Sequence, residues 1–172
     1  MRKRRELKID RHTASGKALT DLILEIFRIN GRLLLAGDRL VADLGLTSAR
    51  WQVLGAVAYA KSPQSVSWLA SGMGLNRQGV QRIVNEMKEE GLVRFEPNPH
   101  HKRAHLVVLT KRGREAFAAA DRLQIPWANA LGRGIPAGDI EGALKIAIQV
   151  RERLGPHAAE RPRKPRDNAA RL

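Results

Sequence analysis

The spacing of small and apolar residues between positions 66 and 91 constrains the fold more than any other feature of the chain. Four of these residues stand at relative offsets of 0, 4, 10 and 13: Ala70, Gly74, Val80 and Ile83. The small first residue lets two helices approach closely, and the glycine permits a sharp turn between them. The two branched residues then pack into the angle from the second helix. The spacing therefore predicts a helix-turn-helix.

The second helix of this pair, predicted from Asn76 to Glu90, has two different faces. Its apolar residues follow the i, i+3, i+4, i+7 spacing of one buried stripe: Val80, Ile83, Val84 and Met87. The other face carries side chains that can donate hydrogen bonds to phosphates or base edges: Arg77, Gln78, Gln81, Arg82 and Asn85. These residues begin at the helix start, where a recognition helix meets the major groove. A solvated amphipathic helix in an ordinary helical domain is the alternative explanation of this pattern.

A predicted β-hairpin follows the helix pair directly. Leu92–Phe95 and Ala104–Leu109 have strand-forming composition, and the loop between them, EPNPHHKR, is basic and contains two prolines. A helix-turn-helix followed by a basic hairpin is a winged helix. Lys102 and Arg103 are candidates to enter a minor groove, whose narrow A·T stretches attract arginine. An exposed turn with ordinary surface charges is the alternative.

Long amphipathic segments flank this unit. Residues 15–44 are predicted to form one helix, whose apolar stripe is too long for the small winged-helix core to cover alone. Further helices are predicted at 48–60, 111–131 and 140–154, with residues 61–65 as a loop. Pro126 is expected to kink or interrupt the helix that contains it. The expected fold class is therefore mainly α with a small β-hairpin wing.

The distribution of charge points to a polyanionic partner. The 172-residue chain has a formal net charge of +14, and the excess lies in residues 1–12, 61–114 and 151–172. We expect a basic flexible arm at 1–12 and a basic disordered tail at 155–172. Both segments are either passive or add nonspecific affinity for DNA. The compact unit between them, 13–154, comprises a DNA-binding core at 46–110 and long helices at 15–44 and 111–154.

Several chemistries find no support in the sequence. The absence of cysteine excludes disulfides and thiolate metal sites. His100, His101 and His105 lack a regular ligand spacing, so phosphate or solvent contact is favoured over metal binding. No phosphate-binding loop, dinucleotide fingerprint or nucleophile elbow occurs, so we expect neither a cofactor nor an enzyme. Without a signal peptide or a long apolar run, the chain is expected to be cytoplasmic and nucleoid-associated, with no membrane partner.

The segment from residue 46 to 117 resembles the MarR family of bacterial transcription regulators. The matching stretches are LTSARWQVL (46–54), SWLASGMGLNRQGVQRIVNEMKEEGLVRFEPNP (67–99) and LVVLTKRGREAF (106–117). The resemblance implies a homodimeric repressor that binds pseudo-palindromic operators in double-stranded DNA, with the long N- and C-terminal helices forming the dimer interface. Many members brace the wing with an aspartate two residues before an arginine. This chain has His101 before Arg103, so it lacks that pair.

The resemblance also implies a site for an effector. Family members commonly release DNA when a small molecule binds between the dimer helices and the winged helix. Arg28, Trp51 and Tyr59 are candidates to line such a site here, although a core position is the alternative for Trp51. We therefore expect a sequence-specific DNA-binding regulator. A sequence-independent architectural DNA-binding protein is the first alternative, and an RNA-binding or ribosome-associated winged helix is the second.

Overall fold

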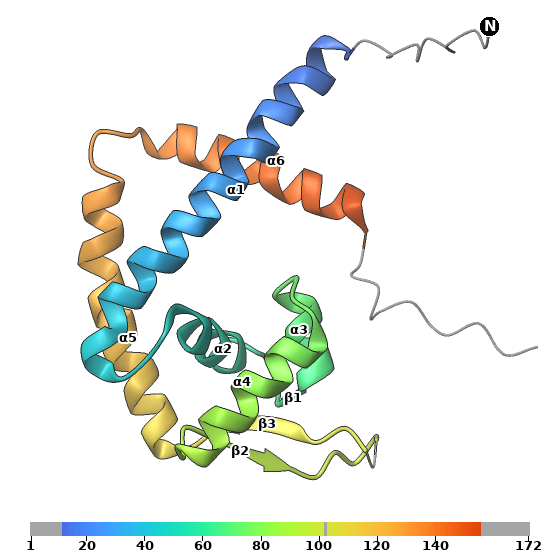
Figure 1. Cartoon of the computed structure of the whole chain (residues 1–172), viewed down its shortest axis with the longest axis vertical. Helices are drawn as coiled ribbons and strands as arrows, with labels where there is room; N and C mark the ends of the chain where they lie inside the picture. The colour runs from blue at the N-terminus through green and yellow to red at the C-terminus, as the bar shows by residue number, and fades with distance from the viewer. Residues whose placement is uncertain (1–11, 102, 156–172) are drawn as a thin grey trace, which may run out of the picture.

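The computed structural model describes residues 12–101 and 103–155, and it is mainly helical (Figure 1). The helices are α1 (Ala14–Val41), α2 (Ser48–Ala58), α3 (Val66–Gly72), α4 (Arg77–Glu89), α5 (Lys111–Leu131) and α6 (Ala137–Leu154), with a short 3-10 helix at Ala42–Leu44. The strands β1 (Gln64–Ser65), β2 (Val93–Glu96) and β3 (Leu106–Leu109) form one antiparallel sheet in the order β1-β3-β2. The predicted fold class is confirmed.

The core lies where α2, α3 and α4 meet the sheet. Its largest fully buried side chains are Val41, Val53, Leu54, Leu69, Val80, Val84, Met87, Val93 and Val107. Ala70 is also buried, which confirms the small residue expected between α3 and α4. Gly74 has a φ of 66°, a left-handed conformation that favours glycine, and it forms the predicted turn between these two helices.

Side-chain caps fix the starts of three helices at the predicted residues. Thr47 Oγ1 accepts a hydrogen bond from the Arg50 backbone N at 3.3 Å, and this contact begins α2. Asn76 Oδ1 accepts from the Gly79 N at 2.7 Å and begins α4. The α5 helix starts in the same way at Thr110. Each cap satisfies a backbone N–H that has no partner within its own helix, so these boundaries could be read from short-range sequence signals.

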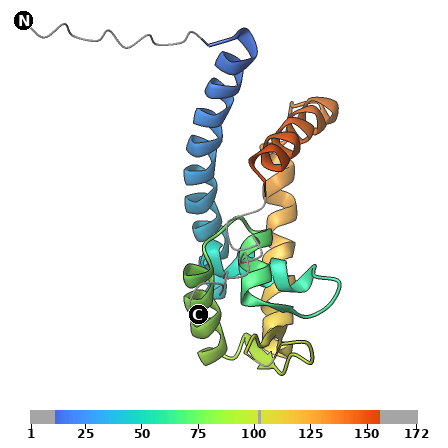
Figure 2. The same ribbon diagram turned by 90° about the vertical axis from the view of Figure 1, so that its right-hand side faces the viewer.

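The long helices depart from the prediction in three places. The α1 helix ends at Val41 and continues as a 3-10 turn, so the predicted helix to Leu44 was three residues too long. The α5 helix continues through Pro126, so of the two predicted effects, a kink or an interruption, the interruption was wrong. The α6 helix begins at Ala137, three residues before the predicted start. Figure 2 shows α1 and α5 as two columns that lead away from the winged helix, with α6 at the far end of α5.

The sequence did not predict strand β1, which lies in the segment expected to be a loop. Gln64 pairs with Val107 and Ser65 pairs with Leu106. A strand of two residues has no periodicity, and its partner is more than forty positions away. The pairing attaches the start of α3 to the central strand, and it therefore fixes the helix-turn-helix relative to the wing.

The start of α5 is packed tightly against the segment that joins α4 to β2. Thr110 Oγ1 donates a hydrogen bond to the carbonyl of Gly91 at 2.6 Å, and the Thr110 N donates to the carbonyl of Leu92 at 3.1 Å. A Cβ atom at Gly113 would overlap the carbonyl oxygen of Leu92 and lie 2.9 Å from its carbonyl carbon. Glycine is therefore required at this helix contact.

The expected arm and tail lie outside the described residues, apart from His12 and Gly155. The domain boundaries assigned to them and to the DNA-binding core stay predictions.

Candidate nucleic-acid interface and effector cavity

The polar face predicted for the recognition helix forms one surface on α4. It comprises Arg77, Gln78, Gln81, Arg82 and Asn85, with Glu86 and Glu89 at its far end. Four of the five predicted residues are exposed, and Gln81 is half-buried. On the opposite side of the helix, Val80, Val84 and Met87 are buried in the core. Four of these five side chains lie in the first half of α4, where the helix N-terminus also favours negative charge, and Asn85 follows in the next turn.

The contacts that these side chains make along α4 are weak enough for a DNA ligand to replace them. Gln81 Nε2 donates a hydrogen bond to Asn85 Oδ1 at 3.0 Å. Arg82 Nη1 lies 3.5 Å from Glu86 Oε1, and the Arg82 side chain is 76% exposed. An exposed pair of this kind contributes only about 0.3–0.5 kcal/mol, so DNA can replace it.

The two glutamates on the inner edge of α4 are held by an arginine that sequence reasoning missed. Arg50 on α2 lies 2.8 Å from Glu90 and 3.5 Å from Glu86, and its side chain is only 20% exposed. This pairing offsets negative charge that would oppose the approach of a phosphate backbone to α4. The sequence did contain a signal for this pairing. The two glutamates are four residues apart, and this spacing places them side by side on a helix.

The wing brings a second arginine to the start of α4. One groove of about 140 Å³ lies between α3, α4 and the wing. Its lining includes Arg77 and Gln81 of α4, Ser65 and Ser67 at the start of α3, and Arg103 and His105 of the wing. Two arginines from separate elements thus border a narrow groove of mixed lining, and two guanidinium groups are suited to a phosphate. Sequence reasoning missed Ser65 and Ser67, whereas His105 is one of the three histidines for which it favoured phosphate or solvent contact. Lys102 lies outside the described residues.

The wing tip is closed by hydrogen bonds to Asn98. Asn98 Oδ1 accepts a hydrogen bond from the His100 N at 2.9 Å, and the His101 N donates to the Asn98 carbonyl at 3.2 Å. The rings of Phe95 and His105 lie 6.1 Å apart, centroid to centroid. An asparagine turn and a ring contact therefore shape this loop.

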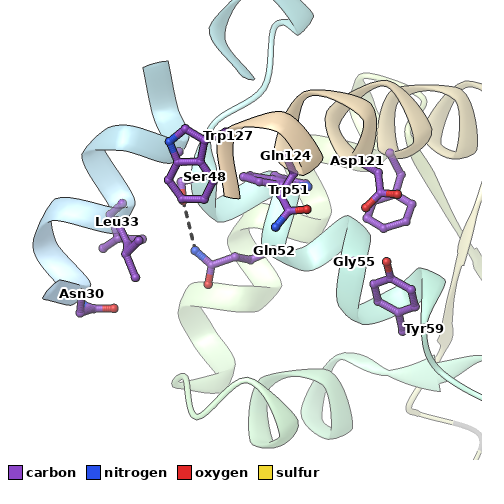
Figure 3. A pocket seen from close by; sticks show the side chains of 13 residues that line it. Asn30, Leu33, Ser48, Trp51, Gln52, Gly55, Tyr59, Asp121, Gln124 and Trp127 are labelled. Atoms are coloured by element: carbon purple, nitrogen blue, oxygen red, sulfur yellow. Dashed lines mark hydrogen bonds between the residues drawn. The ribbon is translucent and has the colours of Figure 1, made fainter. Parts of the chain in front are cut away.

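A cavity of about 490 Å³ lies between α1, α2 and α5 (Figure 3). Each helix contributes one face, and the lining residues are Asn30, Leu33, Leu34, Gly37, Ser48, Trp51, Gln52, Gly55, Tyr59, Phe117, Asp121, Gln124 and Trp127. The cavity therefore includes two of the predicted effector residues, Trp51 and Tyr59. Arg28 is not among the lining residues; its Nη1 pairs instead with Glu25 of the same helix at 3.1 Å.

The contribution of α5 to this cavity was missed, although a signal existed. Phe117, Asp121, Gln124 and Trp127 recur at i, i+4, i+7 and i+10, so polar side chains interrupt one stripe of the helix. The rings of Tyr59 and Phe117 meet edge to face, with centroids 5.5 Å apart. Trp51 also packs against the buried core, so both alternatives considered for it describe its position.

Residues 12–101 and 103–155 have neither a membrane-spanning helix nor a cluster of metal ligands. No helix in this part of the chain is both long and apolar enough to cross a membrane. The same residues contain no group of three or more His, Cys, Asp or Glu side chains arranged to hold a metal ion.

The fold and the basic surface of α4 together define a winged-helix DNA-binding protein. The model of the MarR family matches residues 44–104. An uncharacterised protein of Mycobacterium tuberculosis is 31% identical over 141 residues, which cover 82% of this chain and 95% of that protein. The transcriptional activatory protein BadR of Rhodopseudomonas palustris is 27% identical over 137 residues, covering 77% of this chain and 78% of BadR.

Solved structures agree with this assignment. A MarR family transcriptional regulator from Streptomyces coelicolor is 27% identical, with a TM-score of 0.68, over 81% of this chain and 97% of that one. MosR of M. tuberculosis, solved in complex with DNA, has a TM-score of 0.65 at 22% identity, over 77% and 97% of the two chains. CouR from Rhodococcus jostii RHA1, solved with p-coumaroyl-CoA, has a TM-score of 0.62 at 24% identity, over 78% and 89%. The last two show likeness of fold alone.

This chain belongs to the MarR family, and it is a DNA-binding transcriptional regulator. Members of the family are transcription regulators and not enzymes.

Proposed function

We propose that the protein is a homodimer that binds a pseudo-palindromic operator in double-stranded DNA and represses transcription until a small-molecule effector releases it. The observation that carries this proposal is that the polar surface of α4 and the arginine-lined groove beside the wing share Arg77 and Gln81 and are therefore adjacent. One element could then read base edges while the other holds the adjacent backbone.

In the proposed complex the first half of α4 lies in a major groove. Arg77, Gln78, Gln81 and Arg82 contact base edges or nearby phosphates, and Asn85 extends the same surface. Arginine pairs with guanine, and glutamine or asparagine with adenine, through paired hydrogen bonds. Arg103, together with Lys102, contacts the adjacent minor groove and its backbone.

Unpartnered apolar surface on the long helices supports the homodimer. Within the described chain, α6 buries none of its residues and α1 buries only Gly37 and Val41. Large exposed apolar side chains cover both helices: Leu19, Leu24, Ile26, Phe27, Ile29, Leu33, Leu34 and Leu35 on α1, and Ile140, Leu144, Ile146 and Leu154 on α6. Single soluble chains rarely expose so much contiguous apolar surface.

A second copy of the chain is the partner that this surface fits. A groove of about 540 Å³ between α1 and α6 is lined mainly by apolar side chains, among them Ile23, Phe27 and Val150. A twofold axis through this region would present two α4 helices to two half-sites, one DNA turn or about 34 Å apart. The resulting operator is pseudo-palindromic because the protein is symmetric.

The cavity between α1, α2 and α5 is the proposed effector site. It joins the long helices of the proposed dimer to α2, which carries Arg50 and hence contacts α4. A ligand there would favour one angle between the dimer helices and the winged helix, and this angle sets the distance between the two α4 helices. The related fold of CouR holds an acyl-CoA, which supports ligand binding by such an architecture.

Activation is a second candidate for the sign of regulation, because the relative BadR is a transcriptional activatory protein. Transcription from the bound promoter, with and without the protein, separates the two. A protein-dependent decrease supports repression, and an increase shows activation.

Titration of DNA duplexes tests the central proposal. Fluorescence anisotropy at near-physiological salt would compare duplexes from upstream of the protein's own gene with scrambled controls, followed by selection from a random duplex pool. A preference of about 10³ or more is expected for a specific binder. Equal affinity for selected and scrambled duplexes, with steep salt dependence in both, would instead establish the architectural alternative. Competition with structured RNA tests the ribosome-associated alternative.

A further inference from the structure

We propose that the cavity between α1, α2 and α5 selects a ligand that combines an aromatic ring system with a positively charged nitrogen. This inference rests on the proposed function, because it assigns a chemical class to the effector site named there. It follows from the charge, the aromatic content and the position of the lining residues.

The charge of the lining is opposite to that of the chain. The sequence has 31 Lys and Arg residues against 17 Asp and Glu residues, yet no Lys, Arg or His of the described residues lines this cavity. Asp121 is the one carboxylate in the lining, and no cation of the described residues pairs with it. A ligand cation would provide the ion-pair partner that this carboxylate lacks.

Aromatic side chains are concentrated at the same cavity. The chain has seven Phe, Trp and Tyr residues, and four of them line it: Trp51, Tyr59, Phe117 and Trp127. Trp51 lies on α2, Tyr59 caps the C-terminus of that helix, and the other two lie on α5 (Figure 3). Aromatic faces attract cations, most strongly those of tryptophan, and they also stack on ligand rings. A ring system that carries a charged nitrogen uses both properties.

Amide side chains complete the site. Asn30, Gln52 and Gln124 each offer a donor and an acceptor at the cavity, which could orient polar substituents of the ligand. The volume of about 490 Å³ lies in the range of roughly 300–1,000 Å³ that holds drug-sized molecules. A ligand of two or three fused rings with one amine or quaternary ammonium group fits this size.

An anionic ligand fits the lining poorly. Its carboxylate or phosphate would approach Asp121 with no cationic side chain of the described residues to offset the repulsion. The acyl-CoA bound by CouR carries several negative charges, so the effector of this chain is expected to differ in class from that ligand.

The position of the cavity gives the ligand a route to the DNA-binding helix. Trp51 lines the cavity, and the preceding residue, Arg50, pairs with Glu86 of α4 and with Glu90, which caps the C-terminus of α4. A cation drawn towards Asp121 on α5 and stacked on Trp51 would therefore act on the segment of α2 that holds α4. Ligand binding and operator affinity are coupled through this segment.

Calorimetric titration with three compounds of one ring system tests the proposal. The probes are (2-naphthylmethyl)trimethylammonium, 2-naphthylmethanol and 2-naphthylacetate, which differ mainly in charge. The full chain should bind the cation about tenfold or more tightly than the alcohol, a difference of about 1.4 kcal/mol, and the anion most weakly. Asp121→Asn keeps the side-chain size and should remove this preference, whereas Asp121→Glu keeps the charge and should retain it.

Glu115→Gln is the matched control, because Glu115 is an exposed carboxylate on the same helix and lies outside the cavity lining. It should leave all three affinities unchanged. Tightest binding of the anion, a cation preference that survives Asp121→Asn, or no measurable binding of the cation at millimolar concentration would each overturn the inference. Operator anisotropy measured without any probe reports on the proposed regulator by itself, so the two failures are distinguishable.

Discussion

Arg50 Nη2 lies 2.8 Å from Glu90 Oε1, and this contact ties α2 to the C-terminal end of α4. Replacing Arg50 by methionine would leave Glu86 and Glu90 close together without their shared partner. We expect a loss of about 1–2 kcal/mol in the free energy of unfolding, measured by urea denaturation, because the pair is only partly buried. Lys111→Met is the control. Its pair with Glu115 is 3.9 Å long and largely exposed, so its effect should be close to zero.

The Arg50→Met variant also reports on the orientation of α4. If Arg50 sets that orientation, Arg50→Met weakens operator binding under conditions in which the protein is fully folded. An unfolding free energy equal to that of the unmodified chain would show that the pair is not a structural contact.

Gly113 is expected to be the least replaceable glycine of the chain. A methyl group there overlaps the backbone carbonyl of Leu92, which cannot move without displacing strand β2. We expect Gly113→Ala to lower the free energy of unfolding by about 2 kcal/mol or more, in the range of overpacked cores. Gly72→Ala is the matched control, because a Cβ at Gly72 meets nothing within 4 Å. Equal melting temperatures for the two variants would contradict the close approach at Gly113.

The features that the sequence predicted well are those that depend on short-range chemistry. Local signals predicted the helix-turn-helix from Ala70 and Gly74. They also predicted the caps at Thr47 and Asn76 and the helix stop at Gly91. The missed features are pairings between distant residues. Gln64 becomes a strand only because Val107 is beside it, and the roles of Arg50 and Asp121 depend on helices that the chain brings together only after folding.

Replacing Arg82 tests most directly whether α4 contacts the base edges of the operator. It is largely exposed, and its pair with Glu86 is weak, so its guanidinium is free to reach a base. Arg82→Ala should weaken binding to the operator by about 1–3 kcal/mol and should affect a scrambled duplex less. Lys61→Ala, which removes an exposed charge from the loop before β1 and leaves α4 and the wing unchanged, is the control. Unchanged operator affinity in the Arg82 variant would remove this residue from the reading surface.

Arg103 is expected to act differently, through the DNA backbone. It borders the groove that also contains Arg77. Arg103→Ala should weaken operator and scrambled duplexes by similar factors, and it should reduce the slope of log affinity against log salt by about one. Anisotropy titrations at several salt concentrations measure both quantities. A loss confined to the operator would instead indicate that the wing reads sequence.

Phe27 tests the proposed dimer. Its side chain is 69% exposed on α1 and lines the apolar groove shared with α6. Phe27→Glu would place a charge in that contact in both subunits, and burial of each phenylalanine contributes about 1.5–3 kcal/mol. The dimer dissociation constant, measured by analytical ultracentrifugation, should therefore rise by about 100-fold or more. Operator binding should become steeply dependent on protein concentration, because two subunits must then assemble on the DNA. Lys61→Glu introduces the same residue away from the long helices and should leave the dimer intact. If the Phe27 variant dimerises as tightly as the unmodified chain, the apolar face of α1 is not the subunit interface, and the symmetric operator would need a different surface to bring two α4 helices together.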